Sequence, residues 1–498
     1  MPVKDVTADA PETLWQMVDR QVERLRPDER AMLAVASVSG AEFSAAVAAA
    51  DAIDTREGER RCDALARRGL FLRATGVAEW PDGTVAGRYA FIHALYQQVL
   101  YASVPIRRRV GLHLRTGERL ERAYGPRAGE IAGELAVHFE HGRDIERAVQ
   151  YRSQAAEHAL RQHGYREAAS HARRALDLLA GLPGAQERVQ EELTSHVMLG
   201  TALTAMKGYS APEVERTYAR ALELCGQVDD NPRLFPVLLG LGWFYLVRGP
   251  SRAARDVGRR LGAMAEATQD PAIVLAGHNA IGLVSFYEGE FEAALTHLEQ
   301  GIELYDPGDH SPNRSLAFRG GLDPGLSCTC HVAWTLWVLG YPARAAARMR
   351  EALVLARSLD HPFTLAHACR FAATFHLSRR ERDVVQEQVD ATFALSTEHG
   401  FRVFLAVVKF HRGWLVAEQG RGEEGLAQMR EWVGVCRDIR ADCLIPTYLA
   451  WLAEVYGRIG RPAEGLALVS EALAVGRQSG YQYWTAELHR LKGTFTLQ

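Results

Sequence analysis

The sequence predicts a mainly α-helical protein, in which a winged-helix-like N-terminal module precedes an α-solenoid of helical hairpins of about 40 residues each. Two observations predict this fold class. Glycines in polar turns recur at intervals of about 40 residues, each between an apolar helix and an Ala/Leu-rich helix, and such a fixed period is typical of repeat architectures. Upstream of the repeats, helices precede a single β-hairpin pattern. A chain of 498 residues also exceeds what one hydrophobic core organises.

The composition is that of a folded chain with little charge bias. Apolar residues make up 47% of it and charged residues 24%, and the net charge of −3 gives no overall attraction to nucleic acid or membrane. The seven cysteines are scattered, which favours reduced thiols over a disulfide framework. No signal peptide and no apolar run of about 20 residues is apparent. We therefore expect a cytoplasmic protein.

The first 125 residues are expected to form a flexible segment, 1–10, and a winged-helix-like module, 11–125. Four helices open the module: Pro11–Leu25, Asp28–Ala36, an Ala-rich helix that follows Glu42-Phe43-Ser44 and ends near Ala52, and Glu57–Arg68. Two β-type runs, Leu70–Trp80 and Thr84–Ile92, then flank Pro81-Asp82-Gly83 and predict a hairpin. Helical sequence resumes at His93 and continues to Tyr124.

Residues 126–498 are expected to form the solenoid. Its turn glycines are Gly164, Gly208, Gly249, Gly289, Gly340, Gly420 and Gly460. A small residue follows most of them five positions later, where it lets two antiparallel helices approach closely: Ala169, Ala254, Ala294, Ala345, Gly425 and Gly465. One turn near Arg380 has no glycine, and Val385 stands at its small-residue position.

The unit around Gly460 shows why such hairpins must stack. The helix from Tyr448 to Ile459 carries one apolar stripe with the 3.6-residue period. Gly460 ends it and Pro462 starts the next helix, whose apolar face points back. A single hairpin cannot bury both stripes, so neighbouring hairpins have to pack against it.

Several stretches resemble a known family. They are Pro11–Phe43, Arg88–Tyr101, Ala132–Glu140, Gly208–Val214 and Asp323–Gly325. They are similar to bacterial signal-transduction ATPases with helical-repeat tails, in particular those fused behind a class III adenylate/guanylate cyclase domain. The resemblance implies a winged helix followed by tetratricopeptide-like repeats.

The nucleotide-binding domain of that family would precede residue 1. A phosphate-binding loop needs Gly-Lys-Ser/Thr, and this chain has no Gly-Lys dipeptide. We therefore expect the C-terminal regulatory half of such an architecture, with the solenoid incomplete at its end, where Trp484–Gly493 resembles a first helix without its partner.

Candidate site residues are few. His93 stands where related nucleotide-switch proteins carry a phosphate-contacting histidine, although Ala94 replaces the aspartate that often follows; the alternative is a histidine that starts a helix. The insertion 306–325 is a loop on one face of the solenoid, either functional or merely tolerated. Arginine and tryptophan favour partner binding, so the candidate loop and groove contacts are Arg314, Arg319, Trp334 and Trp337.

No catalytic or metal site is predicted. Cys328 and Cys330, beside His331, are two positions apart on a helix and point in different directions, so we interpret them as buried structural thiols. No Ser/His/Asp set or carboxylate pair stands out. We expect no cofactor, with ATP or ADP acting only through a domain absent from this chain.

The predicted function is a non-catalytic regulatory or sensor module. Its groove would bind a protein, a peptide or a small effector, and the winged helix would relay that state to an ATPase or cyclase module, without a membrane partner. The alternative is a DNA-binding transcriptional regulator that contacts phosphates through Arg60, Arg61 and Arg67. Acidic residues interleave with these arginines, which favours a salt-bridged surface over DNA. An enzyme in the groove is a third hypothesis, and it requires a titratable cluster.

Overall fold

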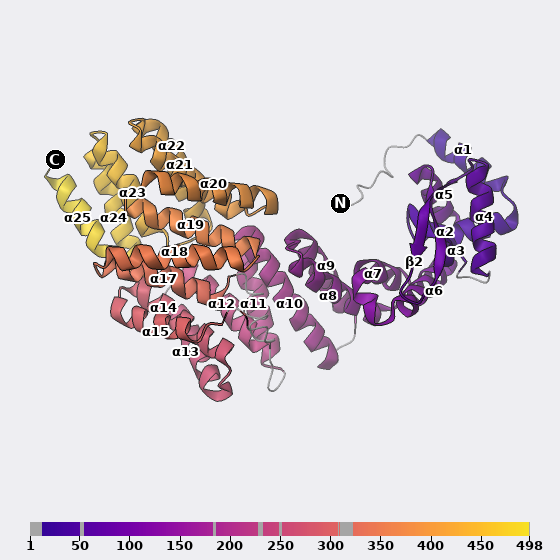
Figure 1. The fold of residues 1–498 in the computed structure, drawn as a ribbon, viewed down its shortest axis with the longest axis horizontal. Coiled ribbons are helices and arrows are strands. Elements are labelled where there is room, and N and C mark those ends of the chain that lie inside the picture. The colour runs from indigo at the N-terminus through magenta and orange to yellow at the C-terminus, as the bar shows by residue number, and fades with distance from the viewer. Residues whose placement is uncertain are drawn as a thin grey trace. The chain divides into compact units, whose positions relative to one another are not determined.

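Helices make up most of the computed structural model, which describes residues 12–49, 54–182, 186–227, 233–248, 251–306, 308 and 322–497 (Figure 1). The chain divides into two units. Unit 1 comprises Met1–His158 and Asp177–Leu182, and unit 2 comprises Ala159–Leu176 and Pro183–Gln498. The predicted mainly-α fold with a solenoid of helical hairpins is confirmed. The domain boundary at 125/126 stays a prediction.

Unit 1 begins with helices and a small sheet. In order, its first elements are α1 (Glu12–Glu23), α2 (Pro27–Ser37), β1 (Glu42–Ser44), α3 (Ala45–Ala48), α4 (Thr55–Arg67), β2 (Leu72–Glu79) and β3 (Val85–Phe91). They are followed by α5 (Ala94–Ser103), α6 (Ile106–Tyr124), a 3₁₀ helix (Gly125–Ile131) and α7 (Ala132–His141). α8 (Ile145–Arg161) and α9 (Tyr165–Ala180) contribute residues to both units.

The predicted hairpin is confirmed, as β2 and β3 pair antiparallel around a turn in which Gly83 has a φ of +82°. A third strand was not expected. β1 pairs with β3, with Phe43 opposite Tyr89, in the sheet order β1-β3-β2. Three residues are too few to show the period of two that identifies a strand, so sequence patterning missed β1.

One predicted helix end in unit 1 is wrong. The helical sequence expected from His93 to Tyr124 forms two helices, α5 and α6, separated by Val104 and Pro105, because a proline inside a helix removes a hydrogen bond and clashes with the preceding turn. The Ala-rich helix α3 ends at Ala48 rather than near Ala52, and residues 50–53 lie outside the described part of the chain.

Unit 2 continues as antiparallel helical hairpins, each helix packing on the next (Figure 1). Its helices are α10 (Gln186–Lys207), α11 (Pro212–Cys225), α12 (Leu234–Arg248), α13 (Ser251–Thr268), α14 (Pro271–Glu288), α15 (Phe291–Glu303), α17 (Pro324–Val338), α18 (Pro342–Ser358), α19 (Pro362–Ser378), α20 (Arg382–His399), α21 (Arg402–Glu418), α22 (Gly422–Asp438), α23 (Ile445–Arg458), α24 (Pro462–Ser479) and α25 (Thr485–Thr496).

The turns follow the predicted pattern with one exception. The left-handed backbone that favours glycine occurs, with φ between +79° and +88°, at Gly208, Gly289, Gly340, Gly420 and Gly460. At the first turn, however, His163 rather than Gly164 has the positive φ, and Arg380 has it at the turn that lacks glycine. Gly249 lies outside the described residues. The small residues five positions after the turns are buried, as expected.

Distant repeats of unit 2 also contact one another. The Cys443 N–H donates to the Val247 carbonyl at 3.1 Å, and the Gln482 N–H donates to the Tyr287 carbonyl at 2.7 Å. The Tyr481 hydroxyl donates to the carbonyl of Leu246 at 2.8 Å. A linear solenoid contacts only its neighbours. Unit 2 therefore folds back on itself, and the groove expected from the sequence is a partly enclosed cavity.

Candidate functional site

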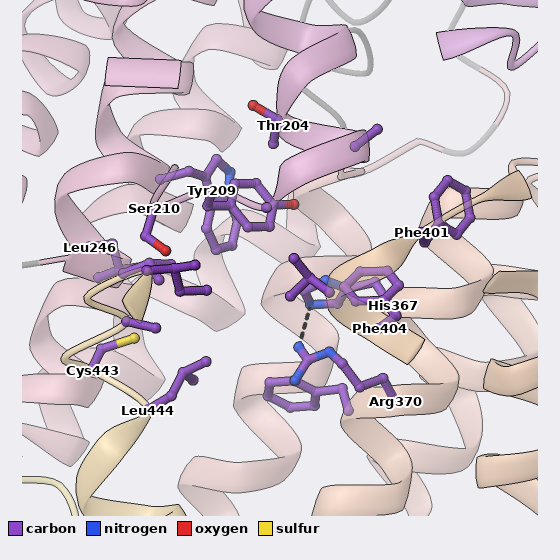
Figure 2. Close-up of a pocket in the computed structure, with 18 of the residues that line it drawn as sticks. Thr204, Tyr209, Ser210, Leu246, His367, Arg370, Phe401, Phe404, Cys443 and Leu444 are labelled. Atoms are coloured by element: carbon purple, nitrogen blue, oxygen red, sulfur yellow. Dashed lines mark hydrogen bonds between the residues drawn. The ribbon is translucent and has the colours of Figure 1, made fainter. Parts of the chain in front are cut away.

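One cavity in unit 2 holds about 800 Å³ of space, part of it open to solvent, and we call it the aromatic cavity. It is lined from α10 to the segment before α23 by Thr204, Ala205, Gly208, Tyr209, Ser210, Trp243, Leu246, Val247, Tyr287, His331, Phe363, His367, Arg370, Phe371, Phe401, Val403, Phe404, Trp432, Ile439, Ala441, Cys443 and Leu444. Figure 2 shows Tyr209 and Ser210 on one side of this space and His367, Arg370 and Phe404 on another.

Local chain geometry places these side chains. Gly208 ends α10 with a φ of +85°, and the chain turns there so that Tyr209 and Ser210 reach the cavity. His361 caps α19 by accepting a hydrogen bond from the Thr364 N–H, and Pro362 occupies the first helical position. His367 and Arg370 follow on this helix three positions apart, so that both lie on the same face.

Aromatic rings form much of the wall. The Tyr209 ring lies 5.0 Å from that of Trp243, and Phe363 stacks on Phe404 with ring centroids 5.2 Å apart. Phe363 also meets Phe401 edge-to-face at 5.3 Å. Such ring pairs are rigid and bury large apolar areas, so the cavity offers an apolar ligand a preformed surface.

Arg370 is the only charged side chain among the described residues that line the aromatic cavity. Its guanidinium carbon lies 5.7 Å from the Phe404 ring centre, and its Nη2 donates to Nε2 of His367 at 3.4 Å (Figure 2). Within the part of the chain that the structure describes, no carboxylate forms an ion pair with it. A cation in an apolar cavity without a counter-charge is costly and therefore points to function.

The neighbouring histidines are neutral. Burial, and to a smaller extent the charge of Arg370, lowers the pKa of His331 to about 4 and holds the pKa of His367 well below its ordinary value. His331 Nδ1 donates to the Ser327 carbonyl at 2.9 Å, which leaves Nε2 as an acceptor. His367 accepts from Arg370 at Nε2, so its Nδ1 carries the proton.

Several polar atoms of the cavity are buried without a hydrogen-bond partner. They are Tyr209 Oη, Ser210 Oγ, His331 Nε2, His367 Nδ1, Arg370 Nε and Trp432 Nε1. Each such group costs on the order of 1–3 kcal/mol when it is left unsatisfied. Native structures rarely accept that cost without a reason, so the wall of the cavity is unusually rich in polar groups for an aromatic surface.

A smaller cavity of about 440 Å³ shares Tyr287, Arg370, Phe371 and Leu444 with the aromatic cavity. Trp334 lines this smaller cavity and is 4% exposed. The structure thus brings one of the predicted groove tryptophans close to Arg370.

The other predicted contacts lie elsewhere. Trp337 lines neither cavity and packs against Phe375 and the guanidinium of Arg379. Arg314 and Arg319 lie outside the described residues.

His93 starts a helix. It is exposed and caps α5, where its Nδ1 accepts from the Leu95 N–H at 3.2 Å. This is the geometry expected of a helix-start histidine, and nucleotide sensing by His93 stays a prediction.

Cys328 and Cys330 are buried, and burial raises the pKa of both thiols to about 12. Cys328 Sγ accepts from Asn279 Nδ2 at 3.3 Å. Among the described residues, no three His, Cys, Asp or Glu side chains are grouped as metal ligands would be. Nor does any described helix have the length and apolarity that crossing a bilayer requires.

Comparison with known proteins gives distant likenesses. No protein-family model matches the chain. An uncharacterised protein of Rhizobium meliloti (strain 1021) is 24% identical over 412 residues, which are 82% of this chain and 40% of the relative. The chain therefore spans about two fifths of the length of the curated relative that it matches.

Among solved structures, the chain is similar to a STAND protein with a tetratricopeptide-repeat sensor from Pyrococcus horikoshii. That likeness has 12% identity and a TM-score of 0.47, and covers 98% of this chain and 68% of the other. A Rap protein complexed with Competence and Sporulation Factor is 11% identical with a TM-score of 0.44, over 70% of this chain and 98% of the other.

Proposed function

We propose that this chain is the non-catalytic sensor and relay part of a larger signalling protein. Unit 2 binds an effector, either a small molecule or a segment of a peptide or protein, in the aromatic cavity. The N-terminal module passes the bound state to an ATPase or cyclase module. The observation that carries the proposal is a partly enclosed aromatic cavity that has Arg370 as the one charged side chain among its described lining residues.

The topology of unit 1 supports the winged-helix part of the proposal. Helices and a short strand precede two further helices, and a hairpin then completes a three-stranded antiparallel sheet in the order β1-β3-β2. The proposed domains remain a winged-helix-like module 11–125 and a helical-repeat domain 126–498, and the expected segment 1–10 lies outside the described residues.

The cavity residues favour binding over catalysis. Burial raises the pKa of the Cys443 thiol, so that it is protonated at neutral pH. Ser210 Oγ has no hydrogen-bond partner that would act as its base. No carboxylate lines the cavity among the described residues. The wall thus lacks an activated nucleophile and an acid–base pair.

Relay requires that the effector binds one arrangement of the solenoid better than another. The contacts that close unit 2, from Cys443 to Val247 and from Gln482 to Tyr287, are the contacts on which such a change would act. An effector that touches both Ser210 and Leu444 would stabilise the closed arrangement.

A thermal-shift screen of small acids, bases, neutral metabolites and short peptides tests the binding step. Leu444→Trp fills the cavity, and Leu304→Trp, at an exposed position of the same unit, is the matched control. We expect hits that raise the melting temperature of the wild type and of Leu304→Trp but not of Leu444→Trp. Hits that also raise the melting temperature of Leu444→Trp would place binding elsewhere and contradict the proposal.

Hydrogen exchange with and without a confirmed hit tests the relay. We expect protection at Gly208–Ser210 and Ile439–Leu444 together with changed exchange in unit 1. Protection confined to unit 2 would leave a binding protein without a relay.

DNA binding is the alternative, and the ion pairs of unit 1 weigh against it. Arg60 and Arg61 pair with Glu57, and Arg67 pairs with Asp63. We expect no salt-dependent binding of duplex DNA in calorimetry at two salt concentrations. Tight binding that falls with salt and is lost in an Arg60, Arg61 and Arg67 triple alanine variant would reverse the ranking.

A further inference from the structure

The unsatisfied polar atoms of the aromatic cavity are mostly donors. Arg370 Nε–H, His367 Nδ1–H and Trp432 Nε1–H can only donate in the states described above, and the hydroxyls of Tyr209 and Ser210 are free to do so. Only His331 Nε2 is restricted to accepting. A ligand that hydrogen-bonds to these side chains is therefore rich in acceptors.

The wall of the cavity carries a positive charge, which suits a ligand with an anionic acceptor group. Arg370 is the one charged group among the described lining residues, and it lies between the aromatic cavity and the smaller cavity. Its charge reaches the surrounding groups, since it contributes to the lowered pKa values of His331, His367 and His411. A planar guanidinium that is held over aromatic rings binds carboxylates through two parallel hydrogen bonds.

The remaining wall is apolar. The rings of Phe363, Phe371, Phe401 and Phe404 line the cavity, and the guanidinium carbon of Arg370 lies 5.9 Å from the ring centre of Phe371 and 5.7 Å from that of Phe404. Inorganic anions would leave this surface uncovered.

We propose that the aromatic cavity binds an organic carboxylate with an apolar or aromatic body, and that Arg370 receives the carboxylate. This inference rests on the proposed function and names the chemical class of the effector. His367 positions the guanidinium, and the donors of Tyr209, Ser210 and Trp432 supply further hydrogen bonds. The carboxylate belongs to a small acid or to the C-terminus of a short peptide.

Two fluorescent probes with the same rings separate charge from shape. Anilinonaphthalene sulfonate carries an anionic group, and N-phenyl-1-naphthylamine is its uncharged counterpart. We expect both to bind the wild type. Arg370→Met lowers the affinity for the anionic probe at least tenfold and changes the affinity for the uncharged probe by less than twofold. Arg370→Lys keeps the charge and retains most of the anionic affinity.

Matched control variants show whether the probes bind in the aromatic cavity. Arg412 also lies over an aromatic ring, with its guanidinium carbon 4.3 Å from the centre of Phe393, but it pairs with Asp390 on an exposed surface. Arg412→Met therefore leaves the affinity for both probes unchanged, whereas Leu444→Trp lowers the affinity for both. Displacement by decanoate but not by decanol, and by a peptide ending in a free acid but not by its amide, shows which source of carboxylate the cavity accepts.

The outcomes distinguish this inference from the proposed function. If Arg370→Met weakens both probes equally, or neither, the carboxylate assignment is overturned while binding in the cavity stands. If Leu444→Trp changes neither probe, or the wild type binds neither, the cavity is not a binding site and both proposals fail. Circular dichroism of each variant confirms that it is folded.

Discussion

A close contact between two helices of unit 2 gives a quantitative prediction about Gly425. This residue lies on α22, at the small-residue position five residues after Gly420, and faces Gly413 on α21. A Cβ at Gly425 would meet the carbonyl oxygen of Gly413 and would lie 2.8 Å from Ala417 Cβ. Conversely, a Cβ at Gly413 would lie 2.6 Å from the Gly425 carbonyl oxygen. Both neighbours belong to regular helices and cannot rotate away.

Gly425→Ala therefore forces α21 and α22 apart. Ordinary contact begins at 3.4 Å, so the helices must separate by about 0.6 Å at Ala417 alone. Overpacking of this kind costs about 1–3 kcal/mol, and the better helix propensity of alanine returns about 1 kcal/mol. We expect a net loss of about 0–2 kcal/mol in the free energy of unfolding of unit 2.

Gly434→Ala is the matched control. Gly434 lies on the same helix, and a Cβ there meets nothing within 4 Å, so only the propensity gain of about 1 kcal/mol applies. The two variants should differ by the overpacking cost alone, about 1–3 kcal/mol. In urea unfolding followed by circular dichroism, with a slope of about 2–3 kcal/mol per M, their midpoints should differ by about 1 M. A Gly425→Ala midpoint equal to or above that of Gly434→Ala would refute this packing argument.

Three further predictions concern one half-buried arginine and several buried histidines and cysteines. Arg370→Met should raise the free energy of unfolding by about 1 kcal/mol, because it removes a cation that no carboxylate of the described residues neutralises; a lower melting temperature would contradict this. Burial lowers the pKa of His113 to about 3 and of His138 to about 4. Since the unfolded chain binds protons below about pH 6.5 that the folded chain does not, unit 1 should lose stability as pH falls from 6.5 toward 4, by up to about 1.4 kcal/mol per pH unit for each histidine. Urea midpoints at pH 7 and 5.5 measure this, and His113→Leu should roughly halve the difference. Thiol titration with Ellman's reagent should leave Cys328 and Cys330 unreacted until the protein unfolds, because burial raises the pKa of both to about 12.

Local patterns predicted the helical hairpins well, because each turn follows from residues that lie next to each other. Gly289, Gly340, Gly420 and Gly460 end their helices in the left-handed conformation that the repeat requires. The failures are also local. At Gly164 the preceding residue takes that conformation, and β1 is too short to carry a strand signal.

The aromatic cavity could not be predicted because its residues come from distant parts of the chain. Arg370 is one of 54 arginines, and nothing in its own neighbourhood marks it. Its significance depends on the ring of Phe404, on the aromatic wall and on the lack of a carboxylate among the described lining residues, none of which sequence spacing shows. Of the two tryptophans expected in the groove, Trp334 lines the smaller cavity, which Arg370 also lines.

The closing contacts of unit 2 also bear on how this unit folds. A linear repeat array frays from its ends and gains structure one neighbour at a time. Here the Tyr481 hydroxyl bonds to a carbonyl 235 residues earlier, and Cys443 bonds to Val247. Contacts of such long sequence separation slow folding, because a large loop must close before they form. They also give the terminal repeats a partner besides their neighbour, so unit 2 should melt in one cooperative transition rather than by stepwise fraying.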